Sequence, residues 1–298
     1  MLICVGSIAF DTVETPEGRA DEVLGGSATY FGFAASLFGP LGLVGVVGED
    51  FPEDHLEELR QRGANTDGVA RAEGRTFRWA GRYVDDMNVR ETTDLQLNVF
   101  GDFDPRLPET YRDAAYCFLA NGSPVLQQRV IDQLRDPTLV MADTMNHWIA
   151  DTREEVLEML RRVDGVIIND EEAMMLAGRR NLVAAARVVA SLGPRIVVLK
   201  KGAHGCLLAV GDRVYPLPAF PLEEVHDPTG AGDSFAGAFM GYLARAGEPS
   251  EENLRRAALY GTLVASFSCE AFSVDRLRKL TLEEVEERGR LFADMLRL

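Results

Sequence analysis

The chain has 298 residues, of which 46% are hydrophobic and 26% are charged, enough for a substantial core in one large α/β domain or two small ones. Its formal net charge of −16 argues against nucleic acid or an anionic membrane as a partner. The four cysteines lie far apart with no CxxC pair, as is typical of buried thiols in a reducing compartment. Because the first strand is short and lacks a basic leader, we expect a cytoplasmic protein without a membrane segment.

The first acid of interest follows a buried strand. Residues 2–9 are apolar and predict a strand that ends at Asp11. This acid would then lie at the carboxyl edge of a sheet, where α/β proteins bind ligands, although a simple turn aspartate is the alternative. Gly25 and Gly26 begin a helix that runs to about Phe38, and paired glycines allow the backbone to approach a ligand closely.

The next segment predicts a strand, a capped helix and a small separate sheet. Residues 41–47 form the strand, and Asp50 caps the helix that follows it. Residues 75–100 contain two partly alternating runs around a polar loop at 85–91. Together with residues 11–24 they predict a small β-sheet lid over a site, and the alternative is an antiparallel extension of the main sheet.

From residue 116 onward, strands and helices alternate. This order predicts a parallel sheet that is covered by helices on both faces. Asp143 falls at the end of one of these strands, and Lys200 and Lys201 at the end of another, where they could contact phosphate, although lysines at strand ends are usually solvated. The predicted strands are 116–120, 138–143, 165–168 and 196–200, and the predicted helices are 125–134, 152–162, 252–268 and one from about 282.

Two polar motifs follow buried strands in the second half of the chain. Asn169 and Glu172 stand at the start of a helix, where the dipole favours acids in any case. The stretch 226–242 joins a rigid Pro-Thr-Gly turn to a helix whose first turn is Gly-Ala-Gly. Free N–H groups at such a start bind phosphate, and Asp233 beside them would hold a hydroxyl that attacks it. The alternative is an ordinary first-turn acid.

The string Asp-Pro-Thr-Gly-Ala-Gly-Asp-Ser-Phe at 227–235 closely resembles the signature of the ribokinase family, also called the phosphofructokinase-B (PfkB) carbohydrate kinases. The Asn-x-x-Glu spacing at 169–172 and the pattern of Asp11 with Gly25-Gly26 are similar to motifs of that family. The resemblance covers essentially the whole chain. It implies one α/β domain, a three-layer sandwich with a mostly parallel sheet and a β lid formed by about 11–24 and 75–100.

The resemblance also implies a reaction and its site residues. An ATP-dependent kinase of this family transfers the γ-phosphoryl group to a hydroxyl of a small sugar, with Mg²⁺ and in some members K⁺. The base would be Asp233, and the anion hole would comprise Gly230, Ala231 and Gly232. The substrate would be bound by Asp11, Gly25 and Gly26. Mg²⁺ and the nucleotide would be organised by Asn169, Glu172, Gly202 and Gly205, and the monovalent cation would be held by Asp227 and Thr229.

Two departures from the family pattern concern specificity. Tyr30 stands where many sugar-specific members have an asparagine, so a nucleoside is the alternative substrate. Ser273 replaces a glycine of the cation site. Relatives often dimerise through the lid, which implies a homodimer here.

The sequence argues against two other classes of nucleotide-binding enzyme. A dinucleotide-dependent dehydrogenase needs a Gly-x-Gly-x-x-Gly turn after the first strand and a P-loop kinase needs Gly-Lys-Ser/Thr, and the sequence has neither at the required place. A non-catalytic sugar or nucleoside sensor on the same fold remains the rival, against which the presence of Asp233, Asn169 and Glu172 counts.

Overall fold

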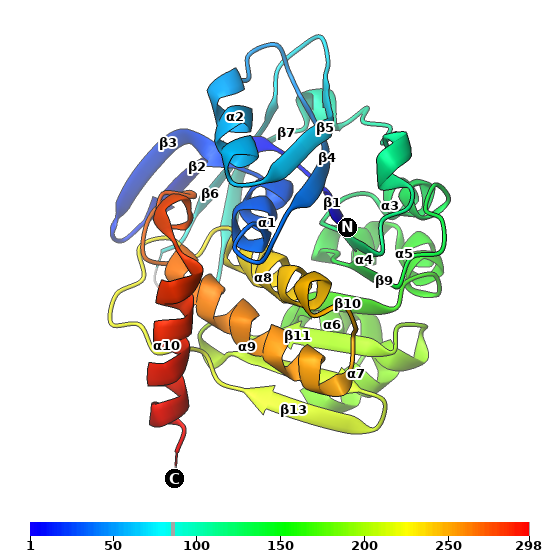
Figure 1. The fold of residues 1–298 in the computed structure, drawn as a ribbon, viewed down its shortest axis with the longest axis vertical. Helices are drawn as coiled ribbons and strands as arrows, with labels where there is room; N and C mark the ends of the chain where they lie inside the picture. Colours follow the sequence, from blue (N-terminus) through cyan, green and yellow to red (C-terminus); the bar gives the residue numbers. More distant parts are fainter. Residues whose placement is uncertain (85–86, 298) are drawn as a thin grey trace.

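A large, mostly parallel sheet forms the centre of the computed structural model, which describes residues 1–84 and 87–297 (Figure 1). In this described part its strand order is β13-β12-β11-β10-β9-β8-β1-β4-β5, and only β12 and β13 run antiparallel to their neighbours. The strands are β1 (Leu2–Val5), β4 (Leu41–Val47), β5 (Ala64–Arg71), β8 (Tyr116–Leu119), β9 (Leu139–Ala142), β10 (Gly165–Asn169), β11 (Ile196–Lys200), β12 (Cys206–Val210) and β13 (Arg213–Leu217).

Helices cover both faces of this sheet because successive strand residues point to opposite sides. Leu2 and Cys4 of β1 belong to one buried core, and Ile3 and Val5 belong to the other. The first core is covered by α1 (Ser27–Ala35), α2 (Glu53–Gln61), α8 (Ala231–Ala246), α9 (Glu251–Ser268) and α10 (Leu282–Met295), the second by α3 (Pro124–Ile131), α4 (Asn146–Asp151), α5 (Arg153–Leu160), α6 (Asp170–Ala177) and α7 (Leu182–Ser191). Among the described residues, no helix has the length and hydropathy to cross a bilayer.

A second, small sheet flanks the end of α1 and has the order β3-β2-β6-β7 (Figure 1). Its strands are β2 (Ala9–Thr15), β3 (Gly18–Gly25), β6 (Phe77–Arg82) and β7 (Glu91–Gln96). β2 pairs parallel with β6, and the other two pairs are antiparallel. All six residues of β7 are exposed, including Leu95. The homodimer predicted to form through this lid stays a prediction.

Two strand boundaries predicted from the sequence are wrong. The predicted strand 2–9 is interrupted after Val5, because Ser7 leaves the sheet and exchanges hydrogen bonds with Ser27 at the start of α1. Asp11 therefore lies inside β2 of the small sheet. The predicted strand 92–100 ends at Gln96, and a 3₁₀ turn at Asn98–Phe100 follows, in which Phe100 stacks on Phe77 at 5.5 Å between ring centroids. Residues 85–86 of the predicted loop lie outside the described residues.

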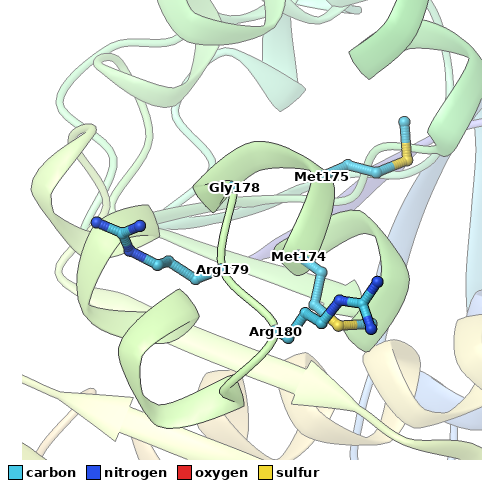
Figure 2. Close-up of a pocket in the computed structure, with 5 residues that line it drawn as sticks. All are labelled: Met174, Met175, Gly178, Arg179 and Arg180. Carbon is cyan, nitrogen blue, oxygen red and sulfur yellow. The ribbon is translucent and has the colours of Figure 1, made fainter.

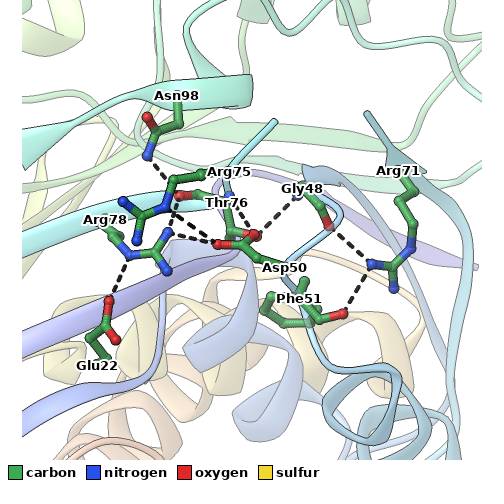
Figure 3. Close-up of polar contacts among 9 residues, drawn as sticks. All are labelled: Glu22, Gly48, Asp50, Phe51, Arg71, Arg75, Thr76, Arg78 and Asn98. Carbon is green, nitrogen blue, oxygen red and sulfur yellow. Dashed lines mark hydrogen bonds and ion pairs between the residues drawn. The ribbon is translucent and has the colours of Figure 1, made fainter. Parts of the chain in front are cut away.

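Asp50 does not cap α2, whose N-cap is Pro52. Its carboxylate instead accepts hydrogen bonds from the backbone N–H and the hydroxyl of Thr76, at 2.8 and 2.7 Å, and pairs with Arg78 at 2.9 Å (Figure 3). These donors satisfy the carboxylate better than a helix start that lies two residues further on. Asp50 thereby ties the end of β4 to β6, and so joins the two sheets.

Candidate active site

The start of α8 presents a left-handed turn with free backbone donors. Gly230 is the N-cap, with φ 74° and ψ −1°. The N–H of Ala231 donates to the carbonyl of Pro228 at 3.2 Å, so this amide is engaged in the turn. The N–H groups of Gly230 and Gly232 make no backbone hydrogen bond to another described residue. The helix start therefore offers these two amides, and the positive end of the dipole, to an anion.

Tyr30 packs directly beneath this turn. A Cβ on Gly230 would lie 2.3 Å from atoms of the Tyr30 ring, so only glycine fits there. Tyr30 is 1% exposed, and burial raises the pKa of its hydroxyl well above the ordinary value, with Asp11, Asp227 and Asp233 adding to the shift. The residue that replaces the family's asparagine thus supports the helix start.

Asp233 lies in the first turn of α8 and carries a perturbed carboxyl group. Burial raises its pKa to about 6, while Lys200 lowers the pKa and Asp143 raises it. Near neutral pH the carboxylate is therefore ionised and can accept a proton from a hydroxyl. A base whose pKa lies close to the working pH is efficient in proton transfer.

An ion pair between Lys200 and Asp143 lies beside this helix start. The ammonium Nζ of Lys200, at the end of β11, is 3.2 Å from the carboxylate of Asp143, which follows β9. Both side chains are largely buried, at 18% and 8% exposed. A Cβ on Gly232 would lie 3.0 Å from the same ammonium. The ammonium thus lies beside Gly232 in the first turn of α8.

Asn169 and Glu172 form a capping box at the start of α6. The Asn169 side chain accepts from the N–H of Glu172, and the Glu172 carboxylate accepts from the N–H of Asn169, both at 2.8 Å. Local structure therefore accounts for both residues. Burial, followed by repulsion from Asp143, raises the pKa of Glu172 to about 8. The same electrostatic cluster thus includes the predicted Asn-x-x-Glu motif.

Asp11 lies on the small sheet and depends on the glycines that follow β3. A Cβ on Gly25 would lie 2.0 Å from a carboxylate oxygen of Asp11, and a Cβ on Gly26 would lie 2.6 Å from the carbonyl of Ser7. Burial raises the pKa of Asp11 to about 7, the N–H of Gly26 opposes that rise, and Asp227 and Asp233 add to it. The structure thus brings this acid into the electrostatic neighbourhood of Asp233.

The turn at Gly202 and Gly205 meets the small sheet. Both glycines have positive φ, 51° and 81°, and a Cβ on Gly205 would lie 2.1 Å from the carbonyl of Leu217. The side-chain oxygen of Asn88, from the loop before β7, accepts from the N–H of Ala203 at 2.9 Å. This loop therefore reaches across from the small sheet to the turn after β11.

Asp227 holds the loop before α8 in place. One of its oxygens accepts from the N–H of Thr229 at 2.8 Å and the other from the N–H of Ser273 at 3.3 Å, and burial raises its pKa. Ser273 adopts φ 57°, in the left-handed region. The hydroxyl of Thr229 lies 3.3 Å from that of Tyr83. These contacts explain both residues locally, and their role as cation ligands stays a prediction.

Sequence reasoning did not single out two residues of the small sheet. Trp79 of β6 is in parallel register with Asp11 of β2, so both side chains lie on the same face. The guanidinium of Arg90 lies over the Trp79 ring, 5.6 Å from its centroid, and lowers the pKa of Asp11 and Asp233. The alternating pattern of residues 77–82 could have placed Trp79 on one face of a strand. It could not have placed Trp79 beside Asp11, because that depends on the pairing with β2.

A pocket on the surface of the protein lies at the other end of α6. It is lined by Met174, Met175, Gly178, Arg179 and Arg180, and Met175 points away from the two arginines (Figure 2). It contains none of the carboxylates described above. This pocket is therefore separate from the carboxylates at the first turns of α6 and α8.

The chain matches the model of the pfkB family of carbohydrate kinases over residues 1–277. It is 31% identical to a cytidine kinase of Thermococcus kodakarensis over 259 residues, which cover 85% of this chain and 92% of that protein. Its structure is similar to the nucleoside kinase of Methanocaldococcus jannaschii, with a TM-score of 0.77, 20% identity and coverage of 97% and 98%. A putative ribokinase II from E. coli, solved with ATP and Mg²⁺, gives a TM-score of 0.79 at 16% identity, with coverage of 97% and 99%.

Proposed function

Because the chain belongs to the pfkB family of carbohydrate kinases, whose members are phosphotransferases with an alcohol acceptor, we propose that it transfers the γ-phosphoryl group of ATP to a hydroxyl of a nucleoside. The family, the kinase reaction class and the ribokinase-like fold predicted from the sequence are confirmed. The free small sugar that the sequence analysis placed first is the second candidate, and the extended similarity to a cytidine kinase favours the nucleoside.

The observation that carries the nucleoside proposal is the indole of Trp79 on the same face of the small sheet as Asp11. The ring lies flat along the strand, because a Cβ on Gly81 would be 2.1 Å from it, and its N–H donates to the Thr92 hydroxyl at 3.2 Å. The guanidinium of Arg90 lies over its face. A surface that accepts a planar cation also accepts a planar base, and such stacking contributes about 1–3 kcal/mol.

The sugar part of the acceptor would lie between the small sheet and α8. Asp11, with a pKa of about 7, can accept a hydrogen bond from one substrate hydroxyl, and Gly25 and Gly26 let the ring approach the backbone. Asp233 would take the proton of the attacking hydroxyl. The amides of Gly230 and Gly232 would hold the γ-phosphoryl group in line with that hydroxyl.

Oxygen donors suited to Mg²⁺ are present near the phosphate end of the site. Burial, followed by repulsion from the buried Asp143, raises the pKa of Glu172, and a divalent cation would relieve that repulsion. Asn169 and Glu172 would hold Mg²⁺ through its waters, as this ion prefers. The ion would supply positive charge that offsets the charge of the phosphates.

An ADP-release assay over a panel of acceptors tests the function. We expect turnover with ATP, Mg²⁺ and at least one of cytidine, uridine, adenosine and inosine, at a kcat/KM above that for ribose or fructose. Turnover with free sugars alone would refute the nucleoside assignment. No ADP release with any acceptor would favour the non-catalytic sensor.

A fluorescence titration tests the position of the base. The chain has two tryptophans, and Trp148 is bound to Asn121 on the side of α4, so Trp148→Phe leaves Trp79 as the single reporter. Adding the preferred nucleoside is expected to change the Trp79 emission, because the base takes the place of Arg90 on the ring.

The kinetic counterpart is Trp79→Ala, which is expected to raise KM for the nucleoside by about 5- to 150-fold with little change in kcat, as loss of about 1–3 kcal/mol of stacking implies. Trp148→Phe serves as the control and should leave KM unchanged. An unaltered KM in Trp79→Ala would show that the base lies elsewhere.

A further inference from the structure

The charge distribution of the site poses a problem for phosphoryl transfer. The chain carries a net charge of −16, and Asp143, Glu172 and Asp233 are clustered where an anionic phosphate must enter. A phosphoryl group next to three carboxylates would be repelled unless positive charge lay between them, supplied by Mg²⁺ or by the protein itself. The described residues place one ammonium group at that point, that of Lys200.

The ammonium of Lys200 is held rigidly and remains charged. It lies 3.2 Å from Asp143 and against the backbone of Gly232, where a Cβ would be 3.0 Å away. Asp143 is itself fixed, because its other carboxylate oxygen accepts from the N–H of Thr144 at 2.8 Å. Although burial alone would lower the pKa of Lys200, the charges of Asp143, Glu172 and Asp233 raise it above the ordinary value.

From this geometry we propose that Lys200 is a catalytic residue that contacts the transferring γ-phosphoryl group, with Asp143 as the positioning residue that holds its ammonium beside Gly232. This inference rests on Asp233 being the site of phosphoryl transfer. In the step, the bond between the γ-phosphorus and the bridging oxygen breaks and its electron pair leaves with ADP. A new bond forms from the γ-phosphorus to the acceptor oxygen, whose proton passes to Asp233. Lys200 neither gives nor takes a proton, and stabilises the negative charge on the equatorial oxygens.

Lys200 and Asp143 act in opposite directions on Asp233, and this makes the inference testable. Lys200 lowers the pKa of Asp233, whereas Asp143 raises it. Removing the ammonium therefore moves the acid limb of the kcat profile to higher pH, and removing the Asp143 charge moves it to lower pH. The groups from the surrounding elements that share this electrostatic neighbourhood are Cys4 of β1, Asp11 of β2, Tyr30 of α1, Glu172 of α6 and Arg90 before β7.

The experiment compares pH profiles of kcat for Lys200→Met, Lys200→Arg and Asp143→Asn, with the exposed Lys279→Met as a matched control. We expect Lys200→Met to lose about 10²- to 10³-fold in kcat, as loss of one transition-state donor does elsewhere, and its acid limb to move upward. Lys200→Arg should retain more of the activity than Lys200→Met, and the acid limb of its kcat profile should lie near that of the wild type. Asp143→Asn should lose activity with its limb moved downward. Lys279→Met should be unchanged.

The outcomes separate this inference from the assignment of Asp233. If Asp233→Asn abolishes turnover while Lys200→Met keeps kcat within threefold and an unmoved acid limb, Lys200 is a structural charge and the inference is overturned. Parallel losses in Lys200→Met and Asp143→Asn with no opposite limb shifts would overturn it as well. Should Lys200→Met fail to fold, the opposite shift in Asp143→Asn and the retained activity of Lys200→Arg still decide the matter. If Asp233→Asn itself turns over like the wild type, the assignment of Asp233 as the base is refuted, and the inference about Lys200 falls with it.

Discussion

Replacing Asp233 with asparagine is expected to lower kcat by about 10²- to 10⁴-fold, the contribution of a positioned general base. The amide keeps the shape of the side chain but cannot take the proton of the attacking hydroxyl. Affinity for ADP, measured by isothermal titration calorimetry, should change little, because Asp233 is proposed to contact the acceptor hydroxyl and the γ-phosphoryl group is absent from ADP.

The matched control for this variant is Asp54→Asn. Asp54 is also a first-turn acid, in α2, and it is exposed and remote from the cluster around Lys200. Loss of a dipole-favoured acid alone should leave kcat unchanged. A kcat for Asp233→Asn that equals the value for Asp54→Asn would reduce Asp233 to an ordinary helix-start residue.

Gly230→Ala is expected to lower kcat by at least about 10²-fold, since removal of one anion-hole donor costs about 2.7–4 kcal/mol. The new methyl group would lie 2.3 Å from the buried Tyr30 ring, so the turn must shift and its amides must leave their alignment. The positive φ of 74° adds about 1–2 kcal/mol of strain.

Gly247→Ala separates these two effects. Gly247 ends the same helix at φ 83°, and a Cβ there would have no atom within 4 Å. Both variants should lose stability in urea unfolding because of the strained φ, but only Gly230→Ala should lose kcat. Equal kcat values for the two variants would show that the α8 start does not hold the transferred group.

The core sheet could be predicted from the sequence because its signals are local. Buried runs such as residues 165–168 and 196–200, alternating with helical stretches, indicate parallel strands wherever they occur. The motif at Asp233 could likewise be read, since the turn, the glycines and the acid are contiguous. The capping box of Asn169 and Glu172 also depends only on residues three apart.

Features that depend on the pairing of distant strands could not be predicted. Lys200 and Asp143 are separated by 57 residues and meet only because β11, β10 and β9 are neighbours in the sheet. The strand predicted at 2–9 has apolar residues on both sides of Gly6-Ser7, so the sequence alone did not show that the chain changes sheets there. Trp79 likewise shares a face with Asp11 only because β6 pairs in parallel with β2.

We propose that phosphoryl transfer takes place at the start of α8, between Asp233 and Lys200. The most direct measurement is a crystal structure with a non-hydrolysable ATP analogue, Mg²⁺ and the preferred acceptor. We expect the γ-phosphate to accept hydrogen bonds from the Gly232 amide and the Lys200 ammonium, with the acceptor hydroxyl between the phosphorus and Asp233. A γ-phosphate bound elsewhere, for example at Arg179 and Arg180 beyond α6, would contradict the account.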